Sequence, residues 1–191
     1  MCIRDSTYSV IKEFGIPLRI ANLGVPQLIK QGLKSALTIE DGRAAMEMIG
    51  AHVLAIHLNY LQEVVQPEGE TKTKGGLKAI EKFATSLPII AKETGAGMPR
   101  EVALKLKKAK VRGLDVGGLG GTSFSAVEYY RARSVGDATR ANIGQTFWNW
   151  GIPTPVSIVL ADVGLPIIAT GGLRSGLDVA RAVSCLLYTS P

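Results

Sequence analysis

The stretch Ala51-His-Val-Leu-Ala-Ile-His57-Leu-Asn-Tyr-Leu-Gln-Glu-Val-Val-Gln-Pro-Glu-Gly-Glu70 decides the fold. Its first part, 51–56, is an apolar run of strand length. Its second part carries a histidine, an asparagine, two glutamines and three glutamates within fourteen residues. Buried parallel strands have near-continuous apolar sequences, and α/β folds place functional side chains where such strands end. The stretch therefore predicts a buried strand that delivers polar side chains to a binding site.

Outward from this stretch, one pattern recurs: an apolar strand, a glycine-rich or polar turn, and an amphipathic helix. Strands are expected at 18–24, 53–59, 87–94, 111–118 and 165–171. Helices are expected at 38–50, 76–86, 99–109, 122–132, 153–163 and 177–183, whereas 134–150 reads as irregular and aromatic. Strands separated by helices favour right-handed βαβ crossovers and a parallel sheet. We therefore expect an α/β fold, a TIM (β/α)8 barrel truncated to about five βα units. A doubly wound sheet is the main alternative, although the glycine fingerprint of dinucleotide-binding domains is missing.

The two ends of the chain depart from the pattern. Met1–Ser6 has no periodicity, and the helix that begins near Leu177 is expected to break off at Cys185. We therefore expect a partial barrel over 7–184 and non-native tails at 1–6 and 185–191. Five units would leave the barrel open with two exposed sheet edges, so such a chain is expected to be poorly stable or prone to aggregation.

The composition fits one globular domain with a sizeable core, since 46% of the 191 residues are hydrophobic. No apolar run reaches membrane-spanning length and no secretory signal opens the chain, which predicts a cytoplasmic protein without a membrane partner. The net charge is +6, and many basic residues lie on the expected helix 99–110 without interleaved aromatics. This pattern favours a solvated face or attraction for a small anion over nucleic-acid binding.

Two glycine-rich turns are candidate phosphate sites. Gly171 and Gly172 end the last expected strand and Arg174 follows, so backbone N–H groups and a guanidinium fork would meet an anion. The turn 115–123 precedes a helix that Thr122 or Ser123 can cap, and on its own it reads equally as a tight turn.

Single polar residues end other strands. Asn22 offers an amide to a heterocycle, or else forms a turn with its own backbone. Lys92 either stabilises negative charge on a cofactor or pairs with Glu93. His57 and Asn59, two residues apart, are expected on the same side of an extended strand.

The polar cluster after the second strand adds three candidates. Gln62 would share a pocket with His57 and Asn59, and Glu63 carries a carboxylate suited to Mg²⁺ beside a diphosphate. Glu128 lies within the first two turns of the helix 122–132, from where it would reach the mouth of the pocket. His52 has no polar neighbours of this kind and is interpreted as structural.

Six motifs follow one another in a specific order. They are Ala21-Asn-Leu-Gly-Val-Pro-Gln-Leu28, His57-Leu-Asn-Tyr-Leu-Gln-Glu-Val-Val-Gln-Pro-Glu-Gly69, Lys92-Glu-Thr-Gly-Ala-Gly97, Asp115-Val-Gly-Gly-Leu-Gly-Gly-Thr-Ser123, Trp150-Gly-Ile-Pro-Thr154 and Ala169-Thr-Gly-Gly-Leu-Arg-Ser-Gly176. Together, over roughly 18–183, they resemble the type 2, flavin-dependent isopentenyl-diphosphate isomerases. The run Gln66–Gly69 is archaeal in character.

The resemblance implies a (β/α)8 barrel that interconverts isopentenyl and dimethylallyl diphosphate without net redox change. It implies FMN, reduced by NADPH or NADH, and Mg²⁺ as cofactors, and a homo-tetramer or homo-octamer as the assembly. By resemblance, the FMN contacts would be Asn22, Lys92 and Thr122, with its phosphate held by Gly171, Gly172 and Arg174. The substrate contacts would be His57, Asn59 and Gln62. Glu63 would bind Mg²⁺, and Glu128 would serve beside Gln62 as a catalytic proton-relay partner.

Two other interpretations remain open. One is an FMN-dependent oxidoreductase of the hydroxy-acid oxidase or glutamate-synthase type, which would require a His–Asp base pair. The other is an inactive truncated fragment or a basic binding module. The family's first two βα units and its eighth strand have no counterpart here, so weak FMN binding is expected and the activity is assigned to the full-length parent.

Overall fold

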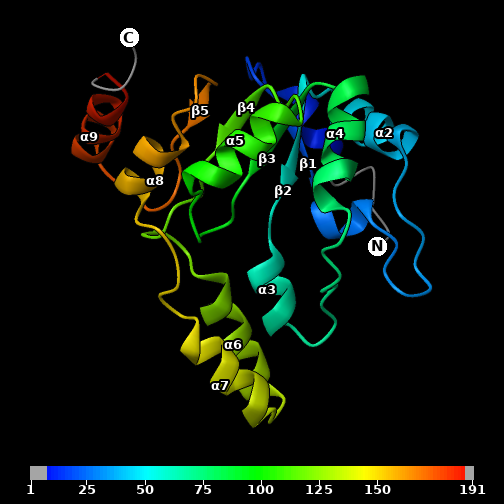
Figure 1. Ribbon diagram of the computed structural model, residues 1–191, viewed down its shortest axis with the longest axis vertical. Coiled ribbons are helices and arrows are strands. Elements are labelled where there is room, and N and C mark those ends of the chain that lie inside the picture. Colours follow the sequence, from blue (N-terminus) through cyan, green and yellow to red (C-terminus); the bar gives the residue numbers. More distant parts are fainter. Residues whose placement is uncertain (1–7, 188–191) are drawn as a thin grey trace.

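A parallel sheet of five strands forms the centre of the molecule, for which the computed structural model describes residues 8–187 (Figure 1). The strands run in sequence order: β1 (Ile20–Gly24), β2 (Val53–His57), β3 (Ile89–Lys92), β4 (Gly113–Asp115) and β5 (Ile167–Ile168). A barrel has its strands in sequence order, whereas in a doubly wound sheet the strand order reverses at a switch point. The expected α/β fold is confirmed, and its five βα repeats are consistent with a partial parallel barrel.

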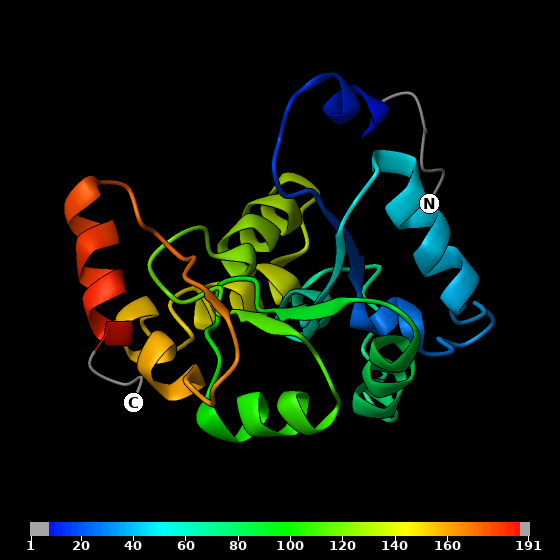
Figure 2. The ribbon, with the colours of Figure 1, turned by 90° about the horizontal axis from the view of Figure 1, so that it is seen from above.

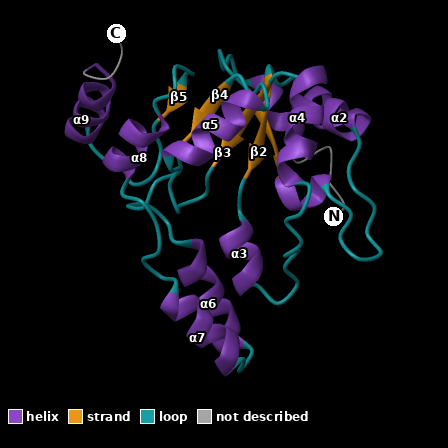
Figure 3. Cartoon of the chain, viewed as in Figure 1, coloured by secondary structure: helices purple, strands orange, loops and turns teal. Residues whose placement is uncertain are grey.

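Helices cover one face of the sheet and extend beyond its carboxyl end. Figure 2 shows an arc of helices around the strands: α2 (Ile39–Ile49), α4 (Gly76–Ser86), α5 (Arg100–Lys108), α8 (Thr154–Ala161) and α9 (Gly176–Leu187). Three further helices lie beyond the strand ends (Figure 3): α3 (Tyr60–Val65), α6 (Phe124–Ser134) and α7 (Ala138–Thr146). Short 3-10 turns occupy η1 (Ser9–Glu13) and η2 (Val25–Leu28).

Local capping explains why several helix boundaries agree with the sequence to within a residue or two. The Thr38 hydroxyl accepts the Asp41 N–H at 3.2 Å, and the Asp41 carboxylate accepts the Thr38 N–H at 2.8 Å, which is a reciprocal capping box at the start of α2. Gly50 ends the same helix with φ of 61°. Both signals stand in the sequence at the helix boundary that they set.

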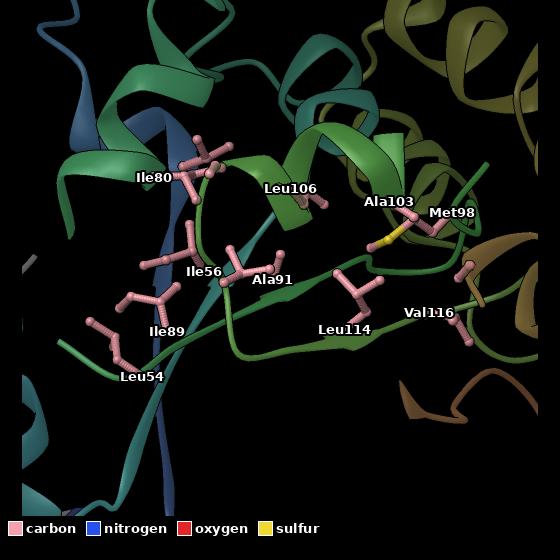
Figure 4. Close-up of a cluster of buried hydrophobic side chains, with 14 of the residues drawn as sticks. Leu54, Ile56, Ile80, Ile89, Ala91, Met98, Ala103, Leu106, Leu114 and Val116 are labelled. Atoms are coloured by element: carbon pink, nitrogen blue, oxygen red, sulfur yellow. The ribbon is translucent and has the colours of Figure 1, made fainter. Parts of the chain in front are cut away.

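The hydrophobic core lies between the outer face of the sheet and the arc of helices. Alternate residues of neighbouring strands supply it, among them Leu54, Ile56, Ile89 and Leu114, and each of these side chains is fully buried (Figure 4). Helices α4 and α5 pack onto them with Ile80, Phe83, Ala103 and Leu106. Burying a side chain of this size contributes about 1.5–3 kcal/mol. Since period-2 alternation commits one sheet face to this core, the other face is available for a site.

Three expectations about local structure are wrong. Residues 134–150 contain α7, which Asp137 caps by accepting the Arg140 N–H at 3.0 Å and which packs on α6. The last helix does not break off at Cys185 but continues to Leu187. The second strand ends at His57, because the chain turns into α3 from Asn59. Of the two expected non-native tails, 1–6 lies outside the described residues, as does all of 185–191 except Cys185–Leu187, and whether either tail is native stays untested.

None of the helices formed by residues 8–187 combines the length and the apolar character that a bilayer crossing requires.

Candidate functional site

The last residues of the five strands form one row across the inner face of the sheet. The parallel register pairs Gly24 with His57, His57 with Lys92, Lys92 with Asp115 and Asp115 with Ile168. Side chains in one row of a sheet point to the same face. A Cβ on Gly24 would lie 2.9 Å from the imidazole Cε1 of His57, so the glycine makes room for this ring. The sheet therefore presents an imidazole, an ammonium and a carboxylate side by side.

An open cavity of about 650 Å³ lies over this row. Its walls come from β1, from the ends of β2 and β3, and from the segments that follow β2, β3, β4 and β5. Eight of the residues expected in the site line it: Asn22, His57, Gln62, Lys92, Thr122, Gly171, Gly172 and Arg174. Cavities of this size accommodate cofactors and small substrates. The fold thus brings together residues that lie up to 152 positions apart, from Asn22 to Arg174.

Lys92 is paired with Asp115 and not with Glu93, so the second of the two interpretations of this lysine is wrong. Its Nζ donates to Asp115 Oδ2 at 2.7 Å. The other carboxylate oxygen, Oδ1, accepts from the Thr170 hydroxyl and from the Gly117 N–H. The physical reason is the register, which places Asp115 directly beside Lys92 across the sheet.

Glu93 has a different role from the one considered in the sequence. Its Oε2 accepts the N–H groups of Thr94 at 2.7 Å and Ala96 at 3.2 Å, which holds the turn after β3. Burial raises the pKa of the Glu93 carboxyl to about 7, although these two bonds and the charge of Lys92 act in the opposite direction. Glu93 lines the main cavity and a small second cavity next to it.

The two glycine-rich loops lie against each other at one end of the cavity. A Cβ on Gly171 would lie 2.3 Å from the Gly118 oxygen, and one on Gly172 would lie 2.1 Å from the Gly120 oxygen. Both residues have positive φ, 116° and 87°, where side chains are strained. Arg174 is exposed and its Nη2 donates to the Gly120 oxygen at 3.3 Å. The result is a rim of backbone groups with one guanidinium, a suitable surface for an anion.

His57 and Asn59 do not lie on the same side of one strand, contrary to expectation. Asn59 has φ of −95° and ψ of 30° and stands at the start of α3, where the extended backbone has ended. Burial lowers the pKa of His57. Within residues 8–187, neither His57 Nδ1 nor Asn59 Oδ1 has a hydrogen-bond partner, although both atoms are buried. Unpartnered buried polar atoms are costly, which makes these two atoms candidates for hydrogen bonds to a ligand.

Gln62, on α3, lies at the junction of the main cavity with the second cavity. The second cavity is largely apolar and includes Leu61, Phe147 and Trp150 in its walls. Trp150 opens one of the six motifs quoted from the sequence, 150–154. The structure brings it to the same small space as Gln62.

The two carboxylates expected beside Gln62 are both engaged with the chain itself. Glu63 accepts from Asn59 Nδ2 at 2.8 Å, Gln66 Nε2 at 2.8 Å and the Glu70 N–H at 2.6 Å. These bonds close the loop after α3. No group of three metal-binding side chains occurs within residues 8–187. A cation at Glu63 would therefore depend on ligands from water or substrate.

Glu128 is buried in α6 with 2% exposure and is held by Arg131, whose Nη1 donates to both carboxylate oxygens at 2.8 and 3.0 Å. The same arginine pairs with Glu68 at 2.8 Å, and the two carboxylates raise its pKa. Glu128 is not among the residues that line the main or the second cavity. Helix α6 does pack against α3, which carries Gln62.

Neither histidine is ion-paired with a carboxylate within residues 8–187. His52 lies at the other end of β2, where its Nδ1 accepts the Arg19 N–H at 3.1 Å, which confirms a structural place. The His–Asp base pair that a hydroxy-acid oxidase would require is therefore missing from these residues.

Sequence reasoning missed Asp115, Thr170 and Glu93 as members of the site. Asp115 and Thr170 occur in quoted motifs, and both stand at or just after a strand end. Their position was a usable signal, because a carboxylate or hydroxyl there faces the ligand side of the sheet.

The chain is similar to archaeal proteins named isopentenyl-diphosphate delta-isomerase. It is 50% identical to the one from Thermoplasma volcanium over 180 residues, which is 94% of this chain and 52% of that protein. It is 49% identical to the one from Picrophilus torridus over 93% of this chain and 50% of that protein. With the one from Archaeoglobus fulgidus the identity is 52%, over 86% of this chain and 46% of that protein.

These similarities confirm the resemblance stated from the motifs. The chain spans about half the length of the curated relatives it matches. No family model matches it.

Proposed function

We propose that the chain is part of an isomerase that interconverts isopentenyl and dimethylallyl diphosphate, using reduced FMN and Mg²⁺. One observation carries the proposal: in a chain about 50% identical to proteins named for this reaction, all six residues expected to contact flavin, and the expected substrate residues His57 and Gln62, line a single cavity. The nicotinamide that would reduce FMN, NADPH or NADH, follows from the family resemblance.

The residues present fit FMN. Gly171 and Gly172 add backbone without side chains to the cavity wall beside Arg174, where a phosphate could approach their N–H groups. Arg174 would face the cofactor phosphate, with Thr122 nearby on the wall. Asn22 and Lys92 also line the cavity, where an amide and an ammonium would meet the flavin ring. A volume of about 650 Å³ lies within the range of cofactor sites.

The reaction is a 1,3-proton shift at an unactivated alkene, for which a glutamine or a lone carboxylate is too weak an acid. The chemistry that reduced FMN supplies when bound is proton donation next to the double bond, with negative charge to stabilise a carbocation-like state. Lys92 would hold that negative charge in place. Gln62 would orient the reacting carbons, and the apolar second cavity would exclude water from them.

The remaining site residues would act on the substrate. His57 and Asn59 would direct their unpartnered atoms to it, and Glu128 would support proton relay near Gln62 through the contact of α6 with α3. Glu63 would bind Mg²⁺ at the diphosphate, after giving up part of its present hydrogen bonding. We further propose a cytoplasmic homo-oligomer, a tetramer or octamer, in the full-length parent.

The test is conversion of isopentenyl diphosphate to dimethylallyl diphosphate by the full-length parent with FMN, NADPH and Mg²⁺. Gln62→Ala should lower kcat at least about 100-fold while flavin absorbance shows FMN still bound. Gln145→Ala, an exposed glutamine on α7, is the matched control and should retain the rate. Glu63→Gln should raise the Mg²⁺ concentration required. Unchanged turnover in Gln62→Ala would rule out its role, and an unaltered Mg²⁺ titration would count against the metal assignment.

A further inference from the structure

The ammonium of Lys92 is fixed by a chain of contacts that crosses three strand ends. Lys92 is the last residue of β3, Asp115 is the last residue of β4, and Thr170 follows β5 by two positions. Lys92 Nζ donates to Asp115 Oδ2 at 2.7 Å, and the Thr170 hydroxyl donates to the other oxygen, Oδ1. The Gly117 N–H donates to both Asp115 Oδ1 and Thr170 Oγ1, at 3.3 and 3.2 Å.

The burial of these groups is unequal. The Asp115 side chain is 8% exposed, while the Lys92 side chain is 32% exposed and lines the cavity. A buried carboxylate is stable only with a full set of donors, and Asp115 obtains them from an ammonium, a hydroxyl and a backbone N–H. The carboxylate is therefore the anchored partner of the pair, and the lysine is the partner that reaches toward the ligand.

We infer that Asp115, itself held by Thr170, is the positioning residue that aims the Lys92 ammonium into the cavity. An ammonium has three N–H donors, and among residues 8–187 Asp115 is the one hydrogen-bond acceptor of the Lys92 ammonium. Two donors therefore remain for a ligand, in a direction set by the third. Glu93 does not compete for the lysine, since its Oε2 holds the turn at Thr94 and Ala96.

The same contacts connect the lysine to the glycine rim. Thr170 precedes Gly171, and its carbonyl accepts the Gly118 N–H at 2.9 Å. One carboxylate thus sets the position of the ammonium relative to both glycine loops. The effect of this on the flavin ring rests on the proposed function, whereas the placement of Lys92 does not.

The test measures acetylation of individual lysines in this chain by an N-hydroxysuccinimide ester, followed by mass spectrometry. An ammonium that donates to a carboxylate must break that bond before its nitrogen attacks the ester. In Asp115→Asn, the amide oxygen keeps the bonds to Thr170 and Gly117, while the amide NH₂ faces Lys92 and cannot accept from it. Lys92 should then react at least about fivefold faster. Thr170→Val should raise the acetylation rate of Lys92 by less, and Thr170→Ser, which keeps the hydroxyl, should retain the wild-type rate.

Two other lysines are internal controls. Lys78 is exposed on α4 and should not change, and Lys107, whose Nζ donates to the Val163 oxygen, reports on unfolding. Asp137→Asn removes a remote carboxylate of α7 and should leave Lys92 unaffected. If Asp115→Asn unfolds the chain, the acetylation rate of Lys107 rises as well. In that case the rates of Lys92 in Thr170→Val and Thr170→Ser decide whether Asp115 positions the lysine.

An unchanged Lys92 rate in folded Asp115→Asn, or equal rates in Thr170→Val and Thr170→Ser, would overturn the inference. A purely structural Asp115 would loosen the turn at Gly117, seen by hydrogen exchange, and leave Lys92 unmoved. Binding of FMN, followed by its fluorescence in the same variants, tests the proposed function separately. A chain with the acetylation response and no FMN binding would support the role of Asp115 and count against the flavin.

Discussion

Replacing Glu93 by glutamine is expected to stabilise the folded chain at alkaline pH far more than at acidic pH. The carboxyl is buried in the wall between the two cavities, and burial raises its pKa from 4.5 to about 7. The folded state therefore keeps a proton that the unfolded state has already released. As pH rises from 4.5 through 7, wild-type stability falls, since the folded state then binds more protons than the unfolded state. Glutamine removes this titration and retains an oxygen for the N–H groups of Thr94 and Ala96.

The magnitude follows from the two pKa values. With about 1.4 kcal/mol per pKa unit, the penalty of ionising Glu93 in the folded state is about 0.8 kcal/mol at pH 5 and about 3.3 kcal/mol at pH 8. The free energy of unfolding of Glu93→Gln minus that of wild type should therefore increase by about 2.5 kcal/mol between these two pH values. Any constant cost of the amide cancels in this difference.

The assay is urea unfolding of both proteins at several pH values between 5 and 8, followed by circular dichroism. Glu81→Gln, which removes an exposed carboxylate from α4, controls for the loss of one charge. A difference between Glu93→Gln and wild type that stays flat from pH 5 to pH 8 would show that burial does not hold the proton on Glu93.

Two further predictions concern close packing and capping. Gly69→Ala should lower the free energy of unfolding by about 2 kcal/mol or more, because the new Cβ would lie 1.6 Å from the Glu63 carbonyl oxygen. The control Gly15→Ala, with no atom within 4 Å of the new Cβ, should leave the free energy of unfolding unchanged. Equal urea midpoints for the two variants would contradict the packing argument. Ser123→Ala should cost about 1–2 kcal/mol in thermal unfolding, since its hydroxyl accepts the Ala126 N–H at the start of α6 and donates to a carbonyl after α7; an unshifted melting temperature would mean that this hydroxyl contributes nothing.

Elements whose signals are local were predictable from the sequence. The start of α2 at Thr38 and its end at Gly50 depend on residues within one turn of the boundary. The strands were predictable because each buried run is apolar and short. They are shorter than predicted, and β2, for example, ends at His57 and not at residue 59. The cavity wall was predictable in large part, because polar residues at the carboxyl ends of parallel strands converge.

Elements that depend on distant contacts were not predictable in this way. Helix α7 has weak amphipathic character, and its packing on α6 needs Gly144, where a Cβ would lie 2.8 Å from the Ser125 oxygen. Glu128 illustrates the same limit. Its ion pair with Arg131 is local, three residues along α6. The contact of that arginine with Glu68, 63 residues away in the chain, depends on the packing of α6 beside α3.

The sequence by itself determined the βα order and the polar residues near the strand ends, such as His57 and Lys92, because both follow from local periodicity and from adjacent residues. Only the tertiary structure decided which carboxylate pairs with Lys92. Glu93 is its neighbour in the chain, but it stands just after β3, where its carboxylate accepts the N–H groups of Thr94 and Ala96. Asp115 lies 23 residues away and becomes its partner because the parallel register sets the ends of β3 and β4 side by side. Register is a property of the assembled sheet, so the partner of Lys92 exists only once the strands have come together.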